Sequence, residues 1–425
     1  MLEHDVVLGS SLVNMYVKCG MLPKAQKVLE RLPIRNVVSW NTLIAGYAQE
    51  GQFSEALNCF EQMQSEGLSP DVVTFICMLK ACGNLGDAKR GQELHAEVER
   101  RGLFEINLGI GNIVMEMYIE CGLLPKALQV FEKLPIRDVV SWNAMISGFT
   151  QNGLGTEALR CFKQMKDTRI CPDVFTYSCI LKACGIVGSL EIGEDIYSEV
   201  REQRLCQKDV ILGTSLVDMY LKCGALDKAR EVFESLPVRD IVAWNSMIAG
   251  YSQNNHSDEA LKCFRKMKDV GLCPNSVTYI CALKACGMTR SLATGEDIVA
   301  EARKQGLLEK NVMLSSALVD MYCKCGALGK ARELFDQLPM QDVVSWNALI
   351  SGHVQHGLGD EALKLFRQMK DAGICPNSVT FICILKACGI VGSLEVGENI
   401  NSEVRKRELF GKDIILNNAM VDMYS

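Results

Sequence analysis

A stretch of 35 residues at 37–71 returns three times in this chain of 425 residues, and each copy begins 102 residues after the one before. All four tryptophans, Trp40, Trp142, Trp244 and Trp346, lie at the fourth position of this stretch. A period this regular is typical of tandem repeat proteins, in which each unit packs on its neighbours. The sequence therefore predicts one long repeat array in place of several separate globular domains.

Two other kinds of unit lie between the tryptophan-bearing copies. We call the 35-residue copies medium units, the 31-residue units such as 210–240 short units, and the 36-residue units such as 72–107 long units. The order short, medium, long predicts twelve complete units after a lead segment at 1–5, with an incomplete thirteenth unit at 414–425. The four triplets cover residues 6–107, 108–209, 210–311 and 312–413. The abrupt ends predict a fragment of a longer protein, with sequence missing beyond the C-terminus at least.

Each unit reads as two helices. In the first medium unit the pattern predicts a helix over 37–49, with Leu43 and Ile44 at helical spacing. Gly51 marks a break, and Ser54 opens the predicted second helix. A lone helix pair cannot cover its apolar faces, so we expect stacked neighbours to form the core and the tryptophans to lie in it.

Composition limits the function classes. The chain has 45 basic and 51 acidic residues, net −6, so its overall charge makes no case for binding nucleic acid and any basic surface must be local. No apolar run approaches the roughly 20 residues needed to span a bilayer, so we expect no membrane partner.

The twenty cysteines favour packing over metal binding. Cys77 and Cys82, like their copies, lie in apolar sequence with the pattern of a helix. Residues five apart on a helix point about 140° apart, so two such cysteines are poorly placed to bind one metal ion together. We interpret these cysteines as small residues at helix contacts, with no metal site. So many unpaired thiols indicate a reducing compartment.

The medium units partly match the tetratricopeptide pattern through Trp40, Leu43, Tyr47, Ala56 and Phe60. Their text W-N-[TAS]-[LM]-I-[AS]-G, then EAL-x-x-F-x-x-M and P-[DN], more closely resembles the pentatricopeptide repeat family. The long and short units resemble its L-type and S-type, and the alternation resembles the plant PLS subclass. The resemblance covers residues 6–425. It implies an all-α protein, a right-handed α-solenoid superhelix of tandem helix-turn-helix repeats, that binds single-stranded RNA in mitochondria or chloroplasts.

In that family the fifth residue of the first helix and the last residue of the unit face one base. The fifth residues of the short and medium units are all uncharged hydrogen-bonding types: Ser10, Asn41, Asn112, Asn143, Thr214, Asn245, Ser316 and Asn347. The last residues are all Asp or Asn: Asn36, Asp71, Asp138, Asp173, Asp240, Asn275, Asp342 and Asn377. A role as helix N-caps is the alternative for the last residues.

Applied to these pairs, the family's tendencies predict the bases A, U, any, U, U, G or any, G, pyrimidine, any, G, pyrimidine, any, from the first unit to the twelfth. The fifth residues of the long units are Ile76, Ser178, Ile280 and Ile382. Isoleucine cannot hydrogen-bond a base, so we expect these units to act as spacers, with Ser178 and Asp209 as the exception.

Two further sets of side chains have two interpretations each. Valines at the second position of the medium units read as core from spacing alone, whereas the resemblance implies wedges between bases: Val38, Val140, Val242 and Val344. Recurrent lysines read either as phosphate contacts or as a solvated helix face: Lys80, Lys182, Lys284 and Lys386 in the long units, Lys18, Lys222 and Lys324 in the short ones.

No catalytic residue is predicted. His95 and Glu97 form an H-x-E string, but the P-C-x-x-C partner motif of zinc deaminases is missing, and no cofactor motif occurs. The resemblance implies a non-enzymatic chain that directs C-to-U editing or other processing of organellar RNA. A deaminase or editing cofactors would act in trans or through a missing C-terminal extension, and no DNA is expected. A tetratricopeptide-type scaffold for protein–protein interaction remains the alternative.

Overall fold

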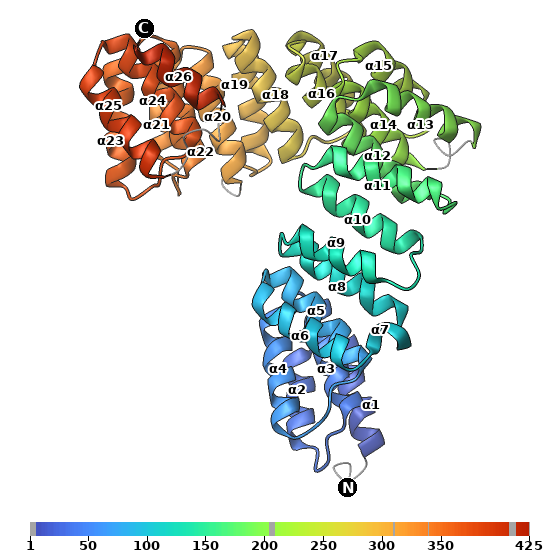
Figure 1. Cartoon of the computed structure of the whole chain (residues 1–425). Helices are drawn as coiled ribbons and strands as arrows, with labels where there is room; N and C mark the ends of the chain where they lie inside the picture. Colours follow the sequence, from blue (N-terminus) through green and yellow to red (C-terminus); the bar gives the residue numbers. More distant parts are fainter. Residues whose placement is uncertain (1–5, 204–208, 309–310, 339, 408–413, 425) are drawn as a thin grey trace. The chain divides into compact units, whose positions relative to one another are not determined.

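The computed structural model describes residues 6–203, 209–308, 311–338, 340–407 and 414–424. Over these residues the regular structure is entirely helical, with 26 helices and no strand (Figure 1). The chain divides into two compact halves, residues 1–215 and 216–425, and each is described by itself. None of the described helices is both long and apolar enough to cross a membrane.

In the described residues the N-terminal half contains thirteen complete helices and the first part of a fourteenth, α14, which crosses its boundary. They are α1 Val6–Lys18, α2 Leu22–Arg31, α3 Val37–Gln49, α4 Phe53–Ser65, α5 Val72–Leu85, α6 Ala88–Arg100, α7 Leu103–Ile106, α8 Leu108–Glu120, α9 Leu124–Lys133, α10 Val139–Gln151, α11 Gly155–Asp167, α12 Val174–Val187, α13 Leu190–Glu202 and α14 Val210–Lys222.

The C-terminal half continues the same series over its described residues. Its helices are α15 Leu226–Ser235, α16 Ile241–Gln253, α17 Ser257–Asp269, α18 Ser276–Thr289, α19 Leu292–Lys304, α20 Val312–Lys324, α21 Leu328–Asp336, α22 Val343–Gln355, α23 Gly359–Asp371, α24 Ser378–Val391, α25 Leu394–Lys406 and α26 Ile414–Tyr424.

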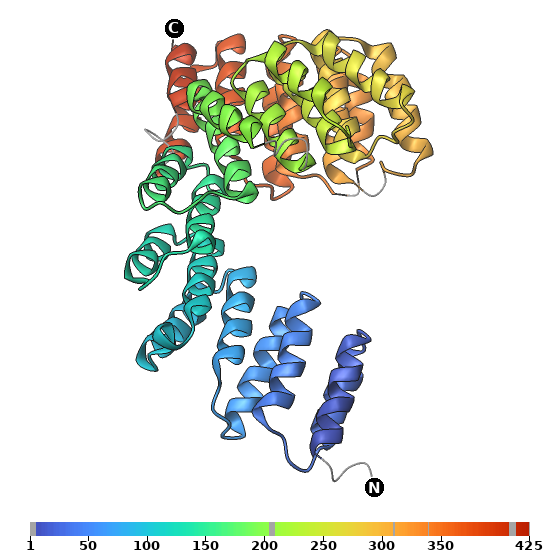
Figure 2. The same cartoon turned by 90° about the vertical axis from the view of Figure 1, so that its right-hand side faces the viewer.

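Within each half the helices form stacked antiparallel pairs (Figures 1 and 2). The first helix of a unit packs on its own second helix and on the first helix of the next unit, as α3 does on α4 and α5. The second helix, α4, also packs on α5. First helices and second helices therefore form two layers, and the core lies between them.

The caps explain where the helices begin and end. Helix α3 has the predicted bounds, and Asn36 caps it by accepting from the amide of Ser39 at 2.8 Å. Helix α4 begins at Phe53, one residue before the predicted Ser54, because Gln52 provides the non-helical N-cap conformation with no side-chain cap. Gly51 and Gly67 adopt positive φ of 72° and 76°, a region open to glycine, which breaks the chain between helices.

The tryptophans lie in the core, as predicted. Trp40 is 2% exposed, beside fully buried Leu43 and Ile44. In the second copy the ring of Trp142 meets that of Phe131 edge to face, with centroids 4.7 Å apart. Such aromatic pairs add about 0.5–1.5 kcal/mol beyond the area that they bury.

Short units pack on the preceding long unit through a methionine that fills the space left by a glycine. A Cβ added at Gly91 on α6 would overlap the sulfur of Met117 on α8, and Gly295 and Met321 repeat the arrangement in the C-terminal half. Met117 is 1% exposed and Met321 fully buried. The glycine therefore sets how closely the two units approach.

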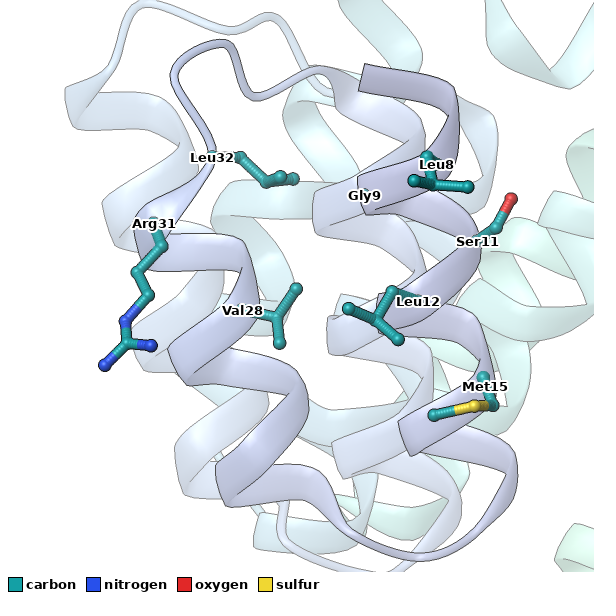
Figure 3. Close-up of a pocket in the computed structure, with 8 residues that line it drawn as sticks. All are labelled: Leu8, Gly9, Ser11, Leu12, Met15, Val28, Arg31 and Leu32. Carbon is teal, nitrogen blue, oxygen red and sulfur yellow. The ribbon is translucent and has the colours of Figure 1, made fainter. Parts of the chain in front are cut away.

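The first short unit shows the same packing face uncovered. Leu8, Leu12 and Met15 are 44%, 38% and 45% exposed, and with Val28 and Leu32 they line a cavity of ≈ 480 Å³ between α1 and α2 (Figure 3). The three equivalent residues of the fourth short unit are at most 1% exposed: Leu314, Leu318 and Met321. This apolar face is the surface by which units stack.

Candidate functional site

In three medium units the predicted fifth and last residues are hydrogen-bonded to each other. Asn41 Nδ2 donates to Asp71 Oδ1 at 2.9 Å, and Asn143 Nδ2 lies 3.1 Å from both carboxylate oxygens of Asp173. Asn347 Nδ2 donates to Asn377 Oδ1 at 3.1 Å. The structure therefore brings together side chains that lie 30 residues apart in the sequence.

A threonine of the following long unit completes each of these networks, and sequence reasoning missed it. The hydroxyl of Thr74 donates to Asn41 Oδ1 at 2.6 Å while it accepts from the amide of Asp71 at 3.1 Å. Thr176 and Thr380 contact Asn143 and Asn347 in the same way, at 2.6 and 2.7 Å. We call these three sets the threonine-linked sites.

The aspartate and the threonine together fix which way the asparagine amide points. An ionised carboxylate only accepts hydrogen bonds, so Asn41 must present its NH₂ group to Asp71 and its oxygen to Thr74. One N–H of that NH₂ group is used by Asp71, and the other is left for a ligand. Reversing the amide would place two acceptor oxygens against each other.

The last residue also caps the next helix. Asp71 Oδ1 accepts from the amide of Thr74 at 2.9 Å and from Nδ2 of Asn41 at 2.9 Å. Burial acts to raise the pKa of Asp71, but hydrogen bonds from Thr74, Asn41 and Val73 outweigh it and hold the pKa below its usual value. The carboxylate thus stays charged and acts only as a hydrogen-bond acceptor.

The third medium unit departs from this arrangement. Asn245 Nδ2 lies 3.4 Å from Asn275 Oδ1, and the hydroxyl of Thr278 lies 3.0 Å from Asn275 Oδ1. Over the described residues, Asn245 Oδ1 is buried without a hydrogen-bond partner. The threonine is present here but does not orient the asparagine.

The short units do not show the fifth-to-last hydrogen bond in the part of the chain that the structure describes. Ser10 Oγ and Asn112 Oδ1 are buried without a partner, while Thr214 and Ser316 donate to the carbonyls of Val210 and Val312 in their own helices. Ser178 Oγ of the second long unit also lacks a partner there. The residue at the third position of the next unit explains the difference: Ser39, Ser141, Ala243 and Ser345 follow the short units.

All eight last residues are helix N-caps, as the alternative interpretation held. The caps are Asn36, Asp71, Asp138, Asp173, Asp240, Asn275, Asp342 and Asn377. In the threonine-linked sites the same side chain performs both tasks, so capping and contact with the fifth residue do not compete.

The second-position valines are exposed, and the interpretation from spacing that placed them in the core was wrong. Val38, Val140, Val242 and Val344 are 64%, 53%, 56% and 59% exposed. Each lies one helical turn from the fifth residue, on the side of the first helix that the second helix leaves open. An exposed apolar side chain thus accompanies every polar pair of the medium units.

The recurrent lysines are exposed in the long units: Lys80, Lys182, Lys284 and Lys386. In the short units Lys222 pairs with Asp218 at 2.8 Å and Lys324 with Asp320 at 2.7 Å. The lysines of the long units are therefore the better placed for an anionic ligand.

The H-x-E string has a packing role. His95 Nδ1 lies 2.8 Å from the Tyr118 hydroxyl, and its ring packs edge-on against Phe104. Burial lowers the pKa of His95, which favours the neutral ring. Among the described residues no three His, Cys, Asp or Glu side chains are placed to hold a metal ion.

Profiles of two repeat families match the chain. The one described as PPR repeat family matches residues 35–84, 137–185, 239–288 and 341–389, and the one described as PPR repeat matches 10–37, 73–103, 214–241 and 315–343. The chain belongs to the pentatricopeptide repeat family.

Relatives in Arabidopsis thaliana are similar over the full chain. The chloroplastic pentatricopeptide repeat-containing protein At1g15510 is 36% identical over 99% of this chain and 48% of its own length. The chloroplastic protein At4g18520 is 35% identical over 100% of this chain and 68% of its own. The mitochondrial pentatricopeptide repeat-containing protein At3g09040 is 35% identical over 100% of this chain and 41% of its own length. The chain thus spans between two fifths and two thirds of these pentatricopeptide relatives.

Solved structures of the family share the fold. The pentatricopeptide repeat protein PPR10 in complex with an 18-nt psaJ RNA element superposes with a TM-score of 0.72, at 19% identity, over 93% of this chain and 59% of that one. The structure of PPR10 from maize gives a TM-score of 0.62 at 20% identity, over 98% of this chain and 65% of that one.

Proposed function

We propose that this pentatricopeptide chain binds single-stranded RNA with sequence specificity, and that its medium units read one base each. The observation that carries the proposal is the threonine-linked site: an oriented amide and a cap residue beside an exposed valine. A base can stack on the valine while its edge meets the polar pair. The RNA held by PPR10 supports this class of ligand.

The groups that the sites leave free account for the predicted bases. Asn143 with Asp173 offers one N–H and the remaining acceptor sites of the carboxylate, which match the O4 acceptor and N3–H donor of uracil. In Asn347 with Asn377, the oxygen of Asn377 is used by Asn347 and by the amide of Thr380, so the pair offers donors only. Donors alone suit the N3 and O2 acceptors of cytosine and also O4 of uracil, hence a pyrimidine.

The proposed register runs from RNA 5′ to 3′ along the chain from residue 6. The array of twelve units, the bases A and G at the short units, and the spacer role of the long units all belong to this proposal. Ser10, Asn112, Thr214 and Ser316 lack the oriented geometry, so we expect them to discriminate bases less sharply than the medium units.

The cellular role that we propose is recognition of target sites in organellar RNA, for C-to-U editing or other processing. The chloroplastic and mitochondrial relatives support an organellar location. The chemistry would come from an editing deaminase in trans or elsewhere in the polypeptide. PLS-type assembly is part of the proposal, and it rests on the alternation of short, medium and long units.

Selection of bound RNA from a random single-stranded pool tests the proposal, with Asn143→Ser selected in parallel. We expect an enriched motif, and a change at one position from U toward purine in the variant. Asn58→Ser, an exposed substitution on α4, is the matched control and should leave the motif unchanged. An absence of enrichment at low salt would reject RNA readout and favour the protein-interaction scaffold.

A further inference from the structure

The first medium unit holds an internal carboxylate between an arginine and the tryptophan indole. Glu66 Oε2 accepts from Trp40 Nε1 at 3.0 Å, and Glu66 Oε1 pairs with Arg35 Nη2 at 2.9 Å. The other amino group of Arg35 donates to the carbonyl of Glu30 at 3.4 Å. Each oxygen of the carboxylate thus meets one donor.

The second and third copies keep both donors and lack the carboxylate. Thr168 and Val270 stand where the first copy has Glu66. Within the described residues, Trp142 Nε1 and Trp244 Nε1 are buried without a hydrogen-bond partner, in side chains that are 2% and 5% exposed. An indole N–H only donates, so each of these two groups is available to an acceptor atom on a ligand.

The arginines of these copies also keep one amino group free. Arg239 donates from Nε to the carbonyl of Phe233 at 3.1 Å and from Nη2 to that of Glu234 at 2.6 Å. No contact of its Nη1 occurs in the part of the chain that the structure describes, and the same holds for Arg137. The free amino group corresponds to the one that binds Glu66 in the first copy.

A cavity of ≈ 380 Å³ opens beside Trp244. Apart from Arg239 and Trp244, its lining is apolar and without acidic side chains: Leu236, Pro237, Val270 and Leu272. The cavity of ≈ 360 Å³ beside Trp142 is lined in addition by Glu132 and Asp167, which disfavour an anion. A second cavity beside Trp244 and Arg239 is lined by Glu234 and Glu259 but also by Arg230, Lys262 and Lys266. Cationic side chains therefore outnumber acidic ones around Trp244, which makes it the stronger candidate.

We infer that Arg239 and Trp244 form a binding site for a carboxylate side chain, supplied by a glutamate or aspartate of a partner protein. The first copy shows the same two donors holding a carboxylate. The apolar lining suits the methylene stem of such a side chain better than a fully hydrated phosphate. The site does not depend on the proposed RNA binding, because exposed Val242 is not among its lining residues, which include Lys262 and Lys266 of the second helix α17.

The test uses ¹H–¹⁵N correlation NMR, in which each of the four tryptophans gives one indole N–H signal. The probe is the blocked peptide acetyl-Gly-Gly-Glu-Gly-Gly-amide, and its Gln analogue is the control ligand. We expect a saturable shift of the Trp244 signal and a weaker response of Trp142. The Trp40 signal should not respond, because its indole N–H already donates to Glu66. The Trp346 signal should not respond either, because Gln341 stands in place of the arginine and donates to the carbonyl of Phe335.

Two variants sharpen the result. Val270→Glu, at a position that is 64% exposed, should place a carboxylate in the site, shift the Trp244 signal without ligand and abolish its response. Val270→Gln is the matched control and should keep the response. Arg239→Gln should weaken peptide binding roughly tenfold or more, because it removes a hydrogen bond between charged groups.

Several outcomes would overturn the inference. An unresponsive Trp244 at high peptide concentration would reject the site, and an equal response of Trp346 would reject the role of Arg239. Equal shifts with inorganic phosphate or with an RNA oligonucleotide would reassign the site to phosphate. Equal shifts with the Gln analogue would reject any need for charge.

Discussion

The hydroxyl of Thr176 lies 2.6 Å from Asn143 Oδ1, although the two residues are 33 positions apart and belong to successive repeats. Thr176 is fully buried, so this contact is shielded from solvent. The orientation of Asn143 is thus set in part by the next repeat. Each threonine-linked site belongs to the junction between two units.

Thr176→Val should reduce discrimination between U and C at the base that we propose faces Asn143, since it removes the hydrogen bond that holds Asn143 Oδ1 while the side-chain volume is kept. We expect a loss of roughly tenfold in the U-to-C binding ratio, the size of one hydrogen bond of about 1 kcal/mol or slightly more. Competition binding with paired oligonucleotides measures the ratio, and Thr176→Ser should restore it.

Thr278→Val is the control for this prediction, because Thr278 forms the same capping box but does not contact Asn245. It should lose stability to a similar extent without a change in base preference. Equal effects of the two valine variants on the ratio would assign Thr176 to capping alone. A failure of the wild type to bind RNA would instead contradict the proposed function.

Asp71 and Asp173 should make stability depend on acid pH. Burial acts to raise the pKa of each, but hydrogen bonds from the following threonine and the partner asparagine prevail and lower it. A lowered folded-state pKa gives stability that is present above the unfolded value of about 3.9 and lost as the pH falls through the folded value.

The measurement is urea unfolding of the wild type and the Asp71→Asn/Asp173→Asn double variant between pH 6 and pH 2.5. Asn is as good an N-cap as Asp, so helix capping is kept. The wild type's advantage should be constant near pH 6 and shrink in the acid range. Parallel stability curves would show that the two carboxylates are not coupled to folding.

Trp40→Phe should destabilise the protein more than Trp142→Phe. Both changes remove similar buried volume, but only Trp40 Nε1 has a partner in the described residues, namely Glu66. We expect the difference to be about 1 kcal/mol, discounted for the partial exposure of Glu66. Thermal unfolding measures it, and equal losses would mean that the indole hydrogen bond contributes nothing.

Gly91→Ala and Gly329→Ala should have opposite effects. A Cβ at Gly91 would overlap Met117, so alanine there should cost about 1–3 kcal/mol as the units are forced apart. Gly329 lies within α21 with nothing within 4 Å of the added atom, so alanine should stabilise by about 0.5–1 kcal/mol. Chemical denaturation measures the change in the free energy of unfolding of each variant. Changes of the same sign in both variants would contradict the prediction.

Alkylation should divide the cysteines by burial. Burial raises the pKa of the Cys59 and Cys82 thiols to about 12, so almost no reactive thiolate forms at neutral pH. Cys171, Cys273 and Cys375 are exposed. Mass spectrometry after brief treatment with N-ethylmaleimide should find the exposed group modified first, and early modification of Cys82 would show that the core opens locally.

Periodicity predicted the fold well because each kind of unit repeats the same pattern of apolar residues four times in the sequence. The bounds of α3 follow from Asn36 as a cap and from the Gly51 break. The exposure of Val38 did not follow, because its spacing fits a core position and only the placement of the second helix decides which side is open.

The candidate site was predictable in part. Asn41 and Asp71 stood out as a polar pair in apolar text, yet Thr74 reads as an ordinary N-terminal helix residue until the two helices are in contact. Likewise, nothing in the local text of Trp40 indicates Glu66, which lies 26 residues away and is replaced in the other copies. Contacts between units are the part that a single repeat does not encode.

The glycine–methionine packing of Gly91 with Met117 recurs at Gly295 with Met321, so successive triplets meet through interchangeable surfaces. A gene duplication or deletion of 102 codons in register would therefore preserve this contact. Under the proposed function, such a change would lengthen or shorten the RNA that the array binds, while point substitutions at the asparagine sites would alter its base preference.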